Sequence, residues 1–277
     1  KYVDKWVIAT TTLPADNQFK YLADKYDIDF FQGSVDDVLA RYYLCAKNYN
    51  SETIVRITGD MPLHDSQIVD EVVKKFKGEK FDFVTNAHKP TYPDGLDVEV
   101  MSMKTLALAY EKSTLPSERE HVTPFIQNNS NGRGLDLFKM HSVENNTDFS
   151  HLRWTVDYQE DFIFIKSIIE ELHPFNPNFG WQDVLELLEK DTELLKLNFN
   201  VERNMGWNTS LRKDWEKRGI ILKESEKLLQ NALNIIPGAS QTFSKSYNQY
   251  VRGVSPVFLD RGLGSHVWDV DGNEYID

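Results

Sequence analysis

The sequence is short of cysteine, of basic residues and of long apolar runs. One cysteine, Cys45, among 277 residues allows no internal disulfide, which suits a reducing cytosol. Lysine and arginine total 31 against 43 aspartates and glutamates, and this net charge of −12 repels phosphate backbones, so we expect no nucleic-acid partner. No apolar stretch approaches the ~18 residues that cross a bilayer, and no charged-then-apolar leader opens the chain, so we expect a cytoplasmic protein without a membrane partner.

A glycine-rich GxxxxGKS loop is also missing, which excludes P-loop chemistry for this sequence. Carboxylates can still hold Mg²⁺ and thereby let an acidic protein bind a small phosphorylated ligand. Hydrophobic residues make up 40% of the chain, enough for a packed core. Because the chain opens on Lys1 rather than Met and stops inside an alternating run at Asp277, we expect both ends to be cut from a longer protein.

The first hundred residues alternate short β-rich runs with longer helical patterns. Strands at 5–11, 28–31 and 52–58 with intervening helices are typical of βαβ units, and they predict an α/β domain with a mainly parallel sheet. A charged helix over 208–233 reads as a connector, and alternating runs follow around a tight turn at Asp271 and Gly272. The predicted segments are therefore an α/β domain, a helical connector and the beginning of a different domain, at 1–205, 206–235 and 236–277.

Two aspartates stand at the ends of expected strands. Asp60 follows the run RITG, and Asp157 ends the run HLRWTVD. Ligands bind beyond the carboxyl ends of strands in open α/β sheets, so the two carboxylates can share one Mg²⁺ there. The alternative for Asp60 is a strand-end turn whose aspartate caps the following helix.

Three further segments carry polar residues with two possible roles. The turn from Gly33 to Arg41 can lie near a nucleoside, or it can be a helix cap with acids complementing the helix dipole. Asp97 and Glu99 share one face of a strand by period two, which suits either hydroxyl recognition or an exposed strand face. The run 117–124 resembles a capping box, in which a lone histidine is more often structural than catalytic.

Taken together, these segments resemble a known family. The runs are ATTT at 9–12, GSVDDVLARYY at 33–43, IVRITGDMPL at 54–63, YPDGLDVEV at 92–100, SEREHVTPFI at 117–126 and HLRWTVDYQED at 151–161. Their order is similar to that of the spore-coat polysaccharide cytidylyltransferases, relatives of the KDO and acylneuraminate cytidylyltransferases. The resemblance covers about residues 1–205. It implies a Rossmann-like, GT-A-like nucleotidyltransferase fold and transfer of CMP from CTP to a sugar or sugar acid, releasing pyrophosphate for surface polysaccharide synthesis.

The resemblance also implies roles for individual residues. Asp60 and Asp157 become the catalytic Mg²⁺ ligands, and an acceptor hydroxyl attacks the α-phosphate as pyrophosphate leaves. The residues implied near the nucleotide are Gly33, Ser34, Asp37, Arg41 and Arg56. The residues implied on the acceptor side are Asp94, Asp97, Glu99, Arg119 and His121.

One part of the family pattern has no counterpart in this sequence. The family opens with a strand and a basic loop similar to ARxxSxRLPGK that wraps the triphosphate, whereas this sequence begins at a later point of the pattern. We therefore expect the fragment to lack activity and to expose an unpaired sheet edge.

The tail resembles the start of class III pyridoxal-phosphate aminotransferases, in particular the glutamate-semialdehyde aminomutase group. The matching pieces are IPGASQTFSKSY at 236–247, Gly253 and the run 255–277, with Lys245 where that group places a substrate-binding arginine. The resemblance implies a fused aminotransferase that uses PLP, whose Schiff-base lysine is not in this sequence, and a homodimer, since both families commonly dimerise. A glycosyltransferase using a nucleotide sugar and a non-catalytic nucleotide-sugar-binding module are the alternative functions.

Overall fold

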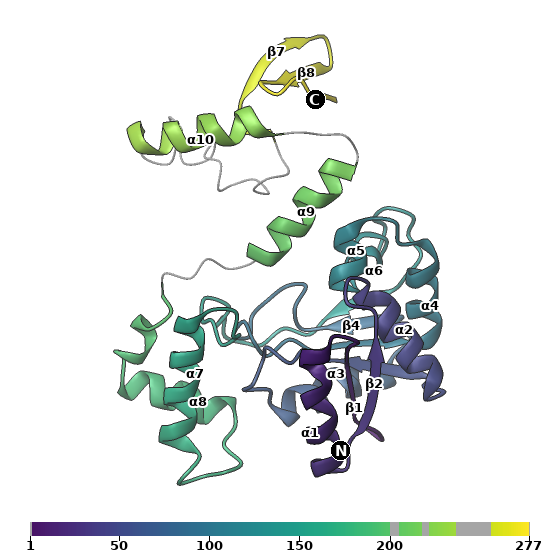
Figure 1. Ribbon diagram of the computed structural model, residues 1–277, viewed down its shortest axis with the longest axis vertical. Helices are drawn as coiled ribbons and strands as arrows, with labels where there is room; N and C mark the ends of the chain where they lie inside the picture. The colour runs from purple at the N-terminus through teal and green to yellow at the C-terminus, as the bar shows by residue number, and fades with distance from the viewer. Residues whose placement is uncertain (1, 200–204, 218–221, 237–255, 277) are drawn as a thin grey trace. The chain divides into compact units, whose positions relative to one another are not determined.

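The computed structural model describes residues 2–199, 205–217, 222–236 and 256–276 (Figure 1). The chain forms two compact units, one made of Lys1–Ser113 with Val122–Arg203, the other of Thr114–His121 with Asn204–Asp277. Lys245 and Gly253, which carry part of the aminotransferase resemblance, lie outside the described residues. The three sequence segments at 1–205, 206–235 and 236–277 stay a prediction.

The first unit begins with a parallel pair of strands. β1 (Val7–Thr11) pairs with β2 (Asp29–Gly33) through a crossover of η1 (Pro14–Asn17) and α1 (Gln18–Tyr26). A second sheet has the order β3-β5-β4-β6, made of β3 (Thr53–Arg56), β4 (Phe83–Thr85), β5 (Glu99–Ser102) and β6 (Met140–Ser142). Within the described residues, the strands with a single partner are β1 and β2 in the first sheet and β3 and β6 in the second. The exposed edge that a missing first strand would leave stays a prediction.

The second sheet is mixed rather than mainly parallel. β4 pairs parallel with β6, but β5 runs antiparallel to both β3 and β4. The reason is the connection between β4 and β5, a loop without a helix, which returns the chain in the opposite direction instead of crossing over. The α/β class follows from the remaining connections, which contain helices.

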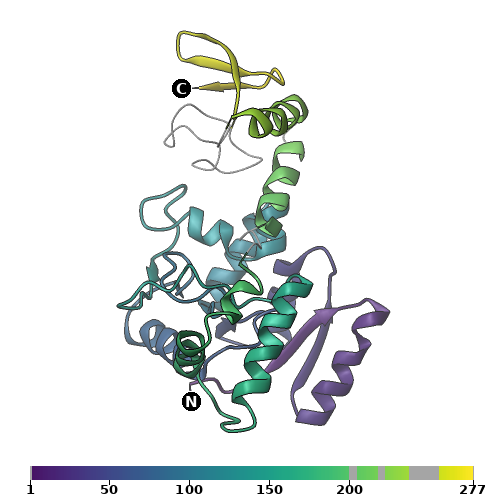
Figure 2. The ribbon, with the colours of Figure 1, turned by 90° about the vertical axis from the view of Figure 1, so that its left-hand side faces the viewer.

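Helices cover both faces of the second sheet (Figures 1 and 2). Val100 of β5 packs with α3 (Ser66–Gly78), α7 (Gln159–Leu172) and α8 (Trp181–Lys190). The next residue, Met101, packs with α2 (Val38–Asn48), α4 (Met103–Lys112) and α6 (Pro124–Asn128). Successive strand residues point to opposite faces, so this alternation places two cores on the two sides of one sheet.

Two expected elements differ in the structure. The run HLRWTVD at 151–157 is extended but not a strand, because Arg153 forms only an isolated parallel bridge with Asp94. The expected helix over 117–128 divides into α5 (Pro116–His121) and α6, since Val122 has a positive φ of 73° that interrupts the helix.

The second unit contains α5, α9 (Met205–Lys217), α10 (Lys223–Ile235) and a three-stranded antiparallel sheet. That sheet has the order β7 (Leu259–Leu263), β8 (His266–Asp269) and β9 (Glu274–Ile276), with Gly272 in its tight turn at a φ of 85°. The single helix expected over 208–233 is two helices in the structure. None of the helices in the described ranges is long and apolar enough to span a bilayer.

One buried carboxylate joins the beginnings of two helices in the first unit. Asp65 is 6% exposed and accepts hydrogen bonds from the backbone N–H of Gln67 in α3, at 2.7 Å, and of Trp181 in α8, at 2.9 Å. The negative charge also complements the positive ends of both helix dipoles. Asp65 thereby fixes α8 against α3, 116 residues away along the chain.

Replacing this residue is expected to destabilise the first unit. Asp65→Ala leaves two helix N–H groups without a partner, and we expect a loss of about 3 kcal/mol in the free energy of unfolding. Asp65→Asn keeps one accepting oxygen and should lose about half as much. Urea unfolding followed by tryptophan fluorescence measures both, and equal losses for the two variants would contradict the double-cap account.

Candidate functional site

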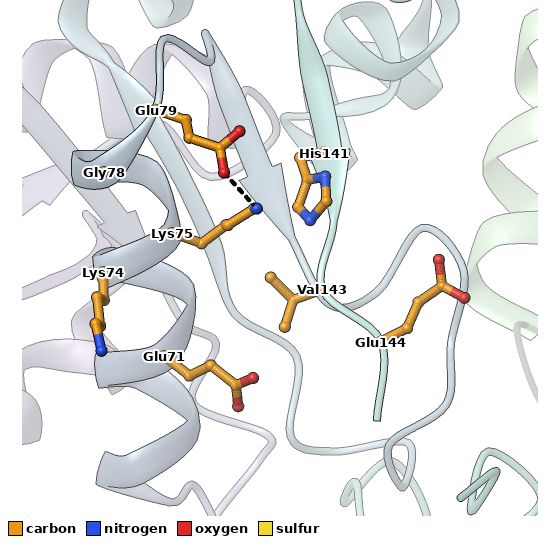
Figure 3. Close-up of a pocket in the computed structure, with 8 residues that line it drawn as sticks. All are labelled: Glu71, Lys74, Lys75, Gly78, Glu79, His141, Val143 and Glu144. Carbon is orange, nitrogen blue, oxygen red and sulfur yellow. Dashed lines mark hydrogen bonds and ion pairs between the residues drawn. The ribbon is translucent and has the colours of Figure 1, made fainter. Parts of the chain in front are cut away.

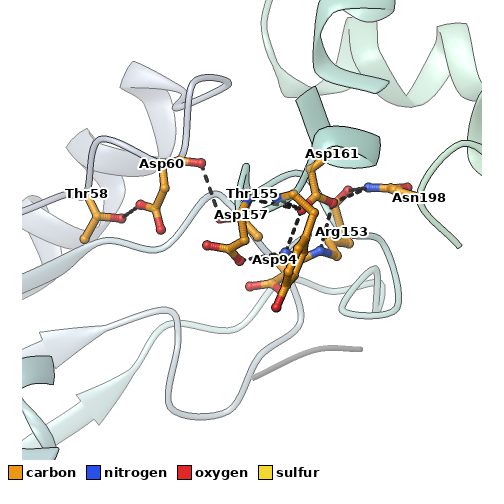
Figure 4. Close-up of polar contacts among 9 residues, drawn as sticks. Thr58, Asp60, Asp94, Arg153, Thr155, Asp157, Asp161 and Asn198 are labelled. Atoms are coloured by element: carbon orange, nitrogen blue, oxygen red, sulfur yellow. Dashed lines mark hydrogen bonds and ion pairs between the residues drawn. The ribbon is translucent and has the colours of Figure 1, made fainter. Parts of the chain in front are cut away.

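A backbone hydrogen bond brings together the two loops that carry Asp60 and Asp157. The N–H of Val156 donates to the carbonyl oxygen of Asp60 at 2.8 Å, and the hydroxyl of Thr155 donates to the same oxygen at 3.3 Å. Figure 4 shows Asp60, on a loop after β3, beside Thr155 and Asp157, on the run before α7. The two aspartates, 97 positions apart, therefore lie on adjoining loops at one edge of the sheet.

Each of these carboxylates uses one oxygen in a contact with its own loop. The hydroxyl of Thr58 donates to Oδ1 of Asp60, and the guanidinium of Arg153 bonds Oδ2 of Asp157 at 2.6 Å. Both aspartates are exposed, and among the described residues the second oxygen of each makes no hydrogen bond. The loops thus orient both carboxylates and leave hard oxygen donors accessible, which fits the ligand preference of Mg²⁺.

Arg153 is the centre of a carboxylate cluster beside this pair. Its guanidinium bonds both oxygens of Asp161, at 3.0 and 2.8 Å, and lies 3.6 Å from Asp94 as well as bonding Asp157. Burial alone would lower the pKa of Arg153, but these carboxylates outweigh burial and raise the pKa. The arginine therefore stays charged and holds the carboxylates of Asp94, Asp157 and Asp161 in place.

Asp161 anchors this cluster from the first turn of α7. Its side chain is fully buried, and Oδ2 accepts the backbone N–H groups of Asp157 at 3.1 Å and Tyr158 at 3.2 Å. Burial would raise the pKa of Asp161, whereas the hydrogen bonds from Arg153, Asp157 and Asn198 lower it more strongly. The carboxylate is ionised at neutral pH, and it fixes the backbone that carries Asp157.

The turn from Gly33 to Arg41 is both a helix cap and a packed loop. Asp37 caps α2 by accepting the N–H of Ala40 at 2.8 Å, and Ser34 accepts the N–H of Asp37 at 3.0 Å. The guanidinium of Arg41 donates to the carbonyl of Ser34 at 3.0 Å. A Cβ added at Gly33 would lie 2.9 Å from the Cγ of Arg41. The structural alternative for this turn is therefore present, and a nucleotide-binding role for these residues stays a prediction.

Arg56 and Glu99, assigned to opposite sides of the site, pair with each other. Their ion pair is 2.5 Å long, and Thr123 donates to the other oxygen of Glu99 at 2.6 Å. The guanidinium of Arg56 also lies 5.5 Å from the centre of the Tyr42 ring. Burial would lower the pKa of Arg56, but Glu99 outweighs this effect and raises the pKa. Both oxygens of Glu99 thus bind protein groups, and a direct role toward an acceptor stays a prediction.

The remaining predicted acceptor residues fall in two places. Asp97 is half-buried and lies two residues before β5 in the first unit. Arg119 and His121 are on α5, which belongs to the second unit. The structure therefore brings Asp94 and Asp157 to Arg153 and joins the Asp60 loop to the nearby backbone of Val156. It does not place all predicted site residues in one described cluster.

Sequence reasoning missed three residues near the aspartate pair. Arg153 and Asp161 could have been found from the run RWTVDYQED, because one arginine followed by acids at i+4 and i+8 predicts an ion-pair cluster at a helix start. His64 gave no such signal. Both of its ring nitrogens are buried and have no hydrogen-bond partner among the residues that the structure describes. Burial lowers the pKa of His64 against the opposing effect of Asp60.

A separate surface pocket lies between α3 and β6, away from these residues (Figure 3). Its volume is about 440 Å³, and its acidic and basic side chains include the pair of Lys75 and Glu79 at 2.6 Å. Within the described ranges, no group of three or more histidine, cysteine, aspartate or glutamate side chains has the geometry of a metal site. A cation site at Asp60 and Asp157 stays a prediction.

Comparison with known proteins defines the class of the first unit as a nucleotidyltransferase-type α/β domain. A solved structure of a cytidylyltransferase from Leptospira borgpetersenii serovar Hardjo-bovis superposes with a TM-score of 0.65 at 32% identity, covering 71% of this chain and 80% of that one. The cytidylyltransferase family matches residues 1–232. The chain belongs to the cytidylyltransferase family, and the predicted Rossmann-like α/β fold is confirmed.

Two relatives cover a similar part of the chain. An uncharacterized protein of Methanocaldococcus jannaschii is 30% identical over 205 residues, which are 73% of this chain and 80% of that protein. The spore coat polysaccharide biosynthesis protein SpsF of Bacillus subtilis is 25% identical over 195 residues, 69% of this chain and 77% of SpsF. The resemblance to spore-coat polysaccharide cytidylyltransferases is thus confirmed.

The C-terminal region is similar to a different protein. Glutamate-1-semialdehyde 2,1-aminomutase 2 of Listeria monocytogenes is 40% identical over 57 residues. This stretch is 21% of the chain and only 13% of the aminomutase. The similarity is consistent with a fusion to an aminotransferase-type domain.

Proposed function

We propose that the protein transfers CMP from CTP to a sugar or sugar acid for surface polysaccharide synthesis. The observation that carries the proposal is the hydrogen bond from Val156 to Asp60, which joins two acidic loops at the sheet edge of a cytidylyltransferase-family chain. The name of the related SpsF, which is a spore coat polysaccharide biosynthesis protein, supports the polysaccharide assignment. In the proposed reaction an acceptor oxygen forms a bond to the α-phosphorus of CTP, and the bond to the β-phosphate oxygen breaks to release pyrophosphate.

The aspartate pair would hold a divalent cation in this reaction. Asp60 and Asp157 are oriented by Thr58 and Arg153 and present one further oxygen each, so the donor set fits Mg²⁺. A bound Mg²⁺ supplies neutralisation of the charge that develops on the phosphates. Arg153 fixes Asp157, and Asp161 fixes Arg153, so the buried cluster acts as the support of an exposed metal site.

The proposed function predicts a nucleotide preference that a pyrophosphate-release screen can measure. The full-length protein is incubated with Mg²⁺, each of the four ribonucleoside triphosphates in turn, and a panel of sugars and sugar acids. We expect pyrophosphate only from CTP and only when an acceptor is present. Pyrophosphate release from another nucleotide would contradict the preference for CTP. Binding of finished nucleotide sugars without pyrophosphate release would contradict the assignment and favour a glycosyltransferase.

We further propose that the C-terminal segment begins a PLP-dependent aminotransferase domain in the full-length protein. The support is the 57-residue similarity to an aminomutase. The aminotransferase domain would then aminate a precursor, and the cytidylyltransferase domain would activate the sugar product in the next step. Finding no aminotransferase sequence after Asp277 in the intact gene would refute the fusion.

A further inference from the structure

Helix α9 buries a polar face against residues 114–121, which we call the α5 segment. Trp207, Ser210, Asp214 and Lys217 follow one another at spacings of three, four and three, so they share one helix face. Ser210 is 0% exposed and Asp214 is 4% exposed. Buried polar groups destabilise a fold unless they are hydrogen-bonded, so the sequence of α9 requires partners at these positions and is unsuited to a free connector.

Asp214 binds the beginning of α5. It accepts the backbone N–H of Ser117 at 2.8 Å and the hydroxyl of the same serine at 2.5 Å. One turn further along α9, the ammonium of Lys217 donates to the carbonyl of Thr114 at 2.6 Å. A charged acceptor with two donors from one residue fixes both the position and the rotation of that residue. The first half of the α5 segment is therefore located by α9.

Ser210 determines which ring nitrogen of His121 carries the proton. The Ser210 hydroxyl donates to Glu120 at 2.9 Å, and it lies 2.9 Å from Nε2 of His121. Burial would raise the pKa of Glu120, but the hydrogen bonds from Ser210 and Lys213 lower it, so Glu120 is an ionised acceptor. The single serine proton is thus used toward Glu120, and Nε2 of His121 must be the donor to Ser210. Neutral His121 then has its lone pair on Nδ1.

The local backbone does not favour this arrangement by itself. Val122, directly after His121, is fully buried and has a φ of 73°, a conformation that is strained for a β-branched residue. Such strain persists only where contacts on both sides impose it. Here Ser210 holds the preceding residue, and the bond from Thr123 to Glu99 holds the following one.

We propose that α9 fixes the α5 segment within the second unit, with Asp214 and Ser210 as positioning residues for Ser117 and His121. This inference rests on the proposed function for the acceptor role of His121. The family match, which runs to residue 232, includes α9. Without α9, the α5 segment would lose these hydrogen bonds and the side chain of His121 would lose its fixed position.

The test uses the full-length protein and two kinds of readout. Nitrogen-15 spectroscopy of labelled histidines reports the tautomer of His121, assigned by its loss in His121→Gln. Hydrogen exchange reports the amides of the α5 segment. We expect the Nε2–H tautomer in the wild type, its loss in Ser210→Ala, and at least tenfold faster exchange in Asp214→Ala. If Asp214→Ala does not fold, Asp214→Asn and Ser117→Ala test the same contact. Glu216→Gln, on the exposed side of α9, is the matched control and should change nothing.

Steady-state kinetics then test whether the contacts of α9 with the α5 segment affect binding of the acceptor. With the acceptor found in the pyrophosphate screen, Ser210→Ala and Asp214→Asn should raise KM for that acceptor about tenfold and leave KM for CTP within twofold. Unchanged tautomer and exchange in both variants, or changes in these without an effect on acceptor KM, would overturn the inference. If the wild type releases no pyrophosphate from any nucleotide, the proposed function fails, and the tautomer and exchange data alone decide whether α9 positions His121.

Discussion

Replacing either Asp60 or Asp157 by asparagine in the full-length protein is expected to lower pyrophosphate release about 10³-fold or more. Each change removes a negative charge from the proposed cation site while keeping side-chain size, and metal-assisted charge neutralisation is worth several kcal/mol in such reactions. The double variant should lose little more than either single one, because both carboxylates serve one cation. Steady-state rates with CTP, at a series of Mg²⁺ concentrations, measure the effect.

Stability separates this effect from misfolding. The Asp60 side chain is exposed and among the described residues bonds only to Thr58, so Asp60→Asn should melt within a degree or two of the wild type. Asp24→Asn is a matched control, since Asp24 is an exposed residue of α1 with a weak ion pair to Lys20. Full turnover in Asp60→Asn or Asp157→Asn would rule out the metal assignment.

Gly95→Ala is expected to cause the largest loss of stability in the first unit. Gly95 has a φ of 119°, and a Cβ there would lie 2.6 Å from the backbone carbon of Trp154 and 2.8 Å from the N of Thr155. The backbone strain and the clash with the main chain both lower the free energy of unfolding, and we expect a loss of about 3 kcal/mol or more. The displaced backbone also leads directly to Asp157, so catalysis should fall as well.

Gly78→Ala provides the comparison for this prediction. Gly78 ends α3 with no heavy atom within 4 Å of an added Cβ, so its replacement should change the free energy of unfolding by less than about 0.5 kcal/mol. Urea titration followed by circular dichroism measures both variants. Equal stability of Gly95→Ala and wild type would show that the loop before β5 does not pack on the Trp154 backbone.

The sequence predicted the parts of the fold that depend on local pattern. The α/β order, the family and the location of Asp60 and Asp157 on one sheet edge follow from strand-helix alternation and ordered motifs. Residues 151–157 were predicted as a strand because their side chains alternate, yet only one bridge, between Asp94 and Arg153, forms there. Alternation reports which side chains are buried, whereas a strand also needs a partner strand alongside.

The sequence alone does not show which polar side chains pair with residues far away along the chain. The pairing of Arg56 with Glu99 and the contact of Asp214 with Ser117 join residues 43 and 97 positions apart. A charge-rich segment such as α9 reads as solvent-exposed, because nothing in its own composition shows that a second polar surface covers it. The interruption of the helix at Val122 was not predicted either, because nothing in the local sequence indicates a positive φ at a valine.

The central claim is that Asp60 and Asp157 bind one divalent cation, and a crystal structure of the full-length protein with Mn²⁺ and a non-hydrolysable CTP analogue tests it most directly. Anomalous scattering locates Mn²⁺, which accepts the same oxygen ligands as Mg²⁺. The account predicts one anomalous peak within about 2.3 Å of an oxygen from each aspartate and from the nucleotide phosphates. A peak bound to other residues, or one bound to phosphates while Asp60 and Asp157 point away from it, would contradict the claim.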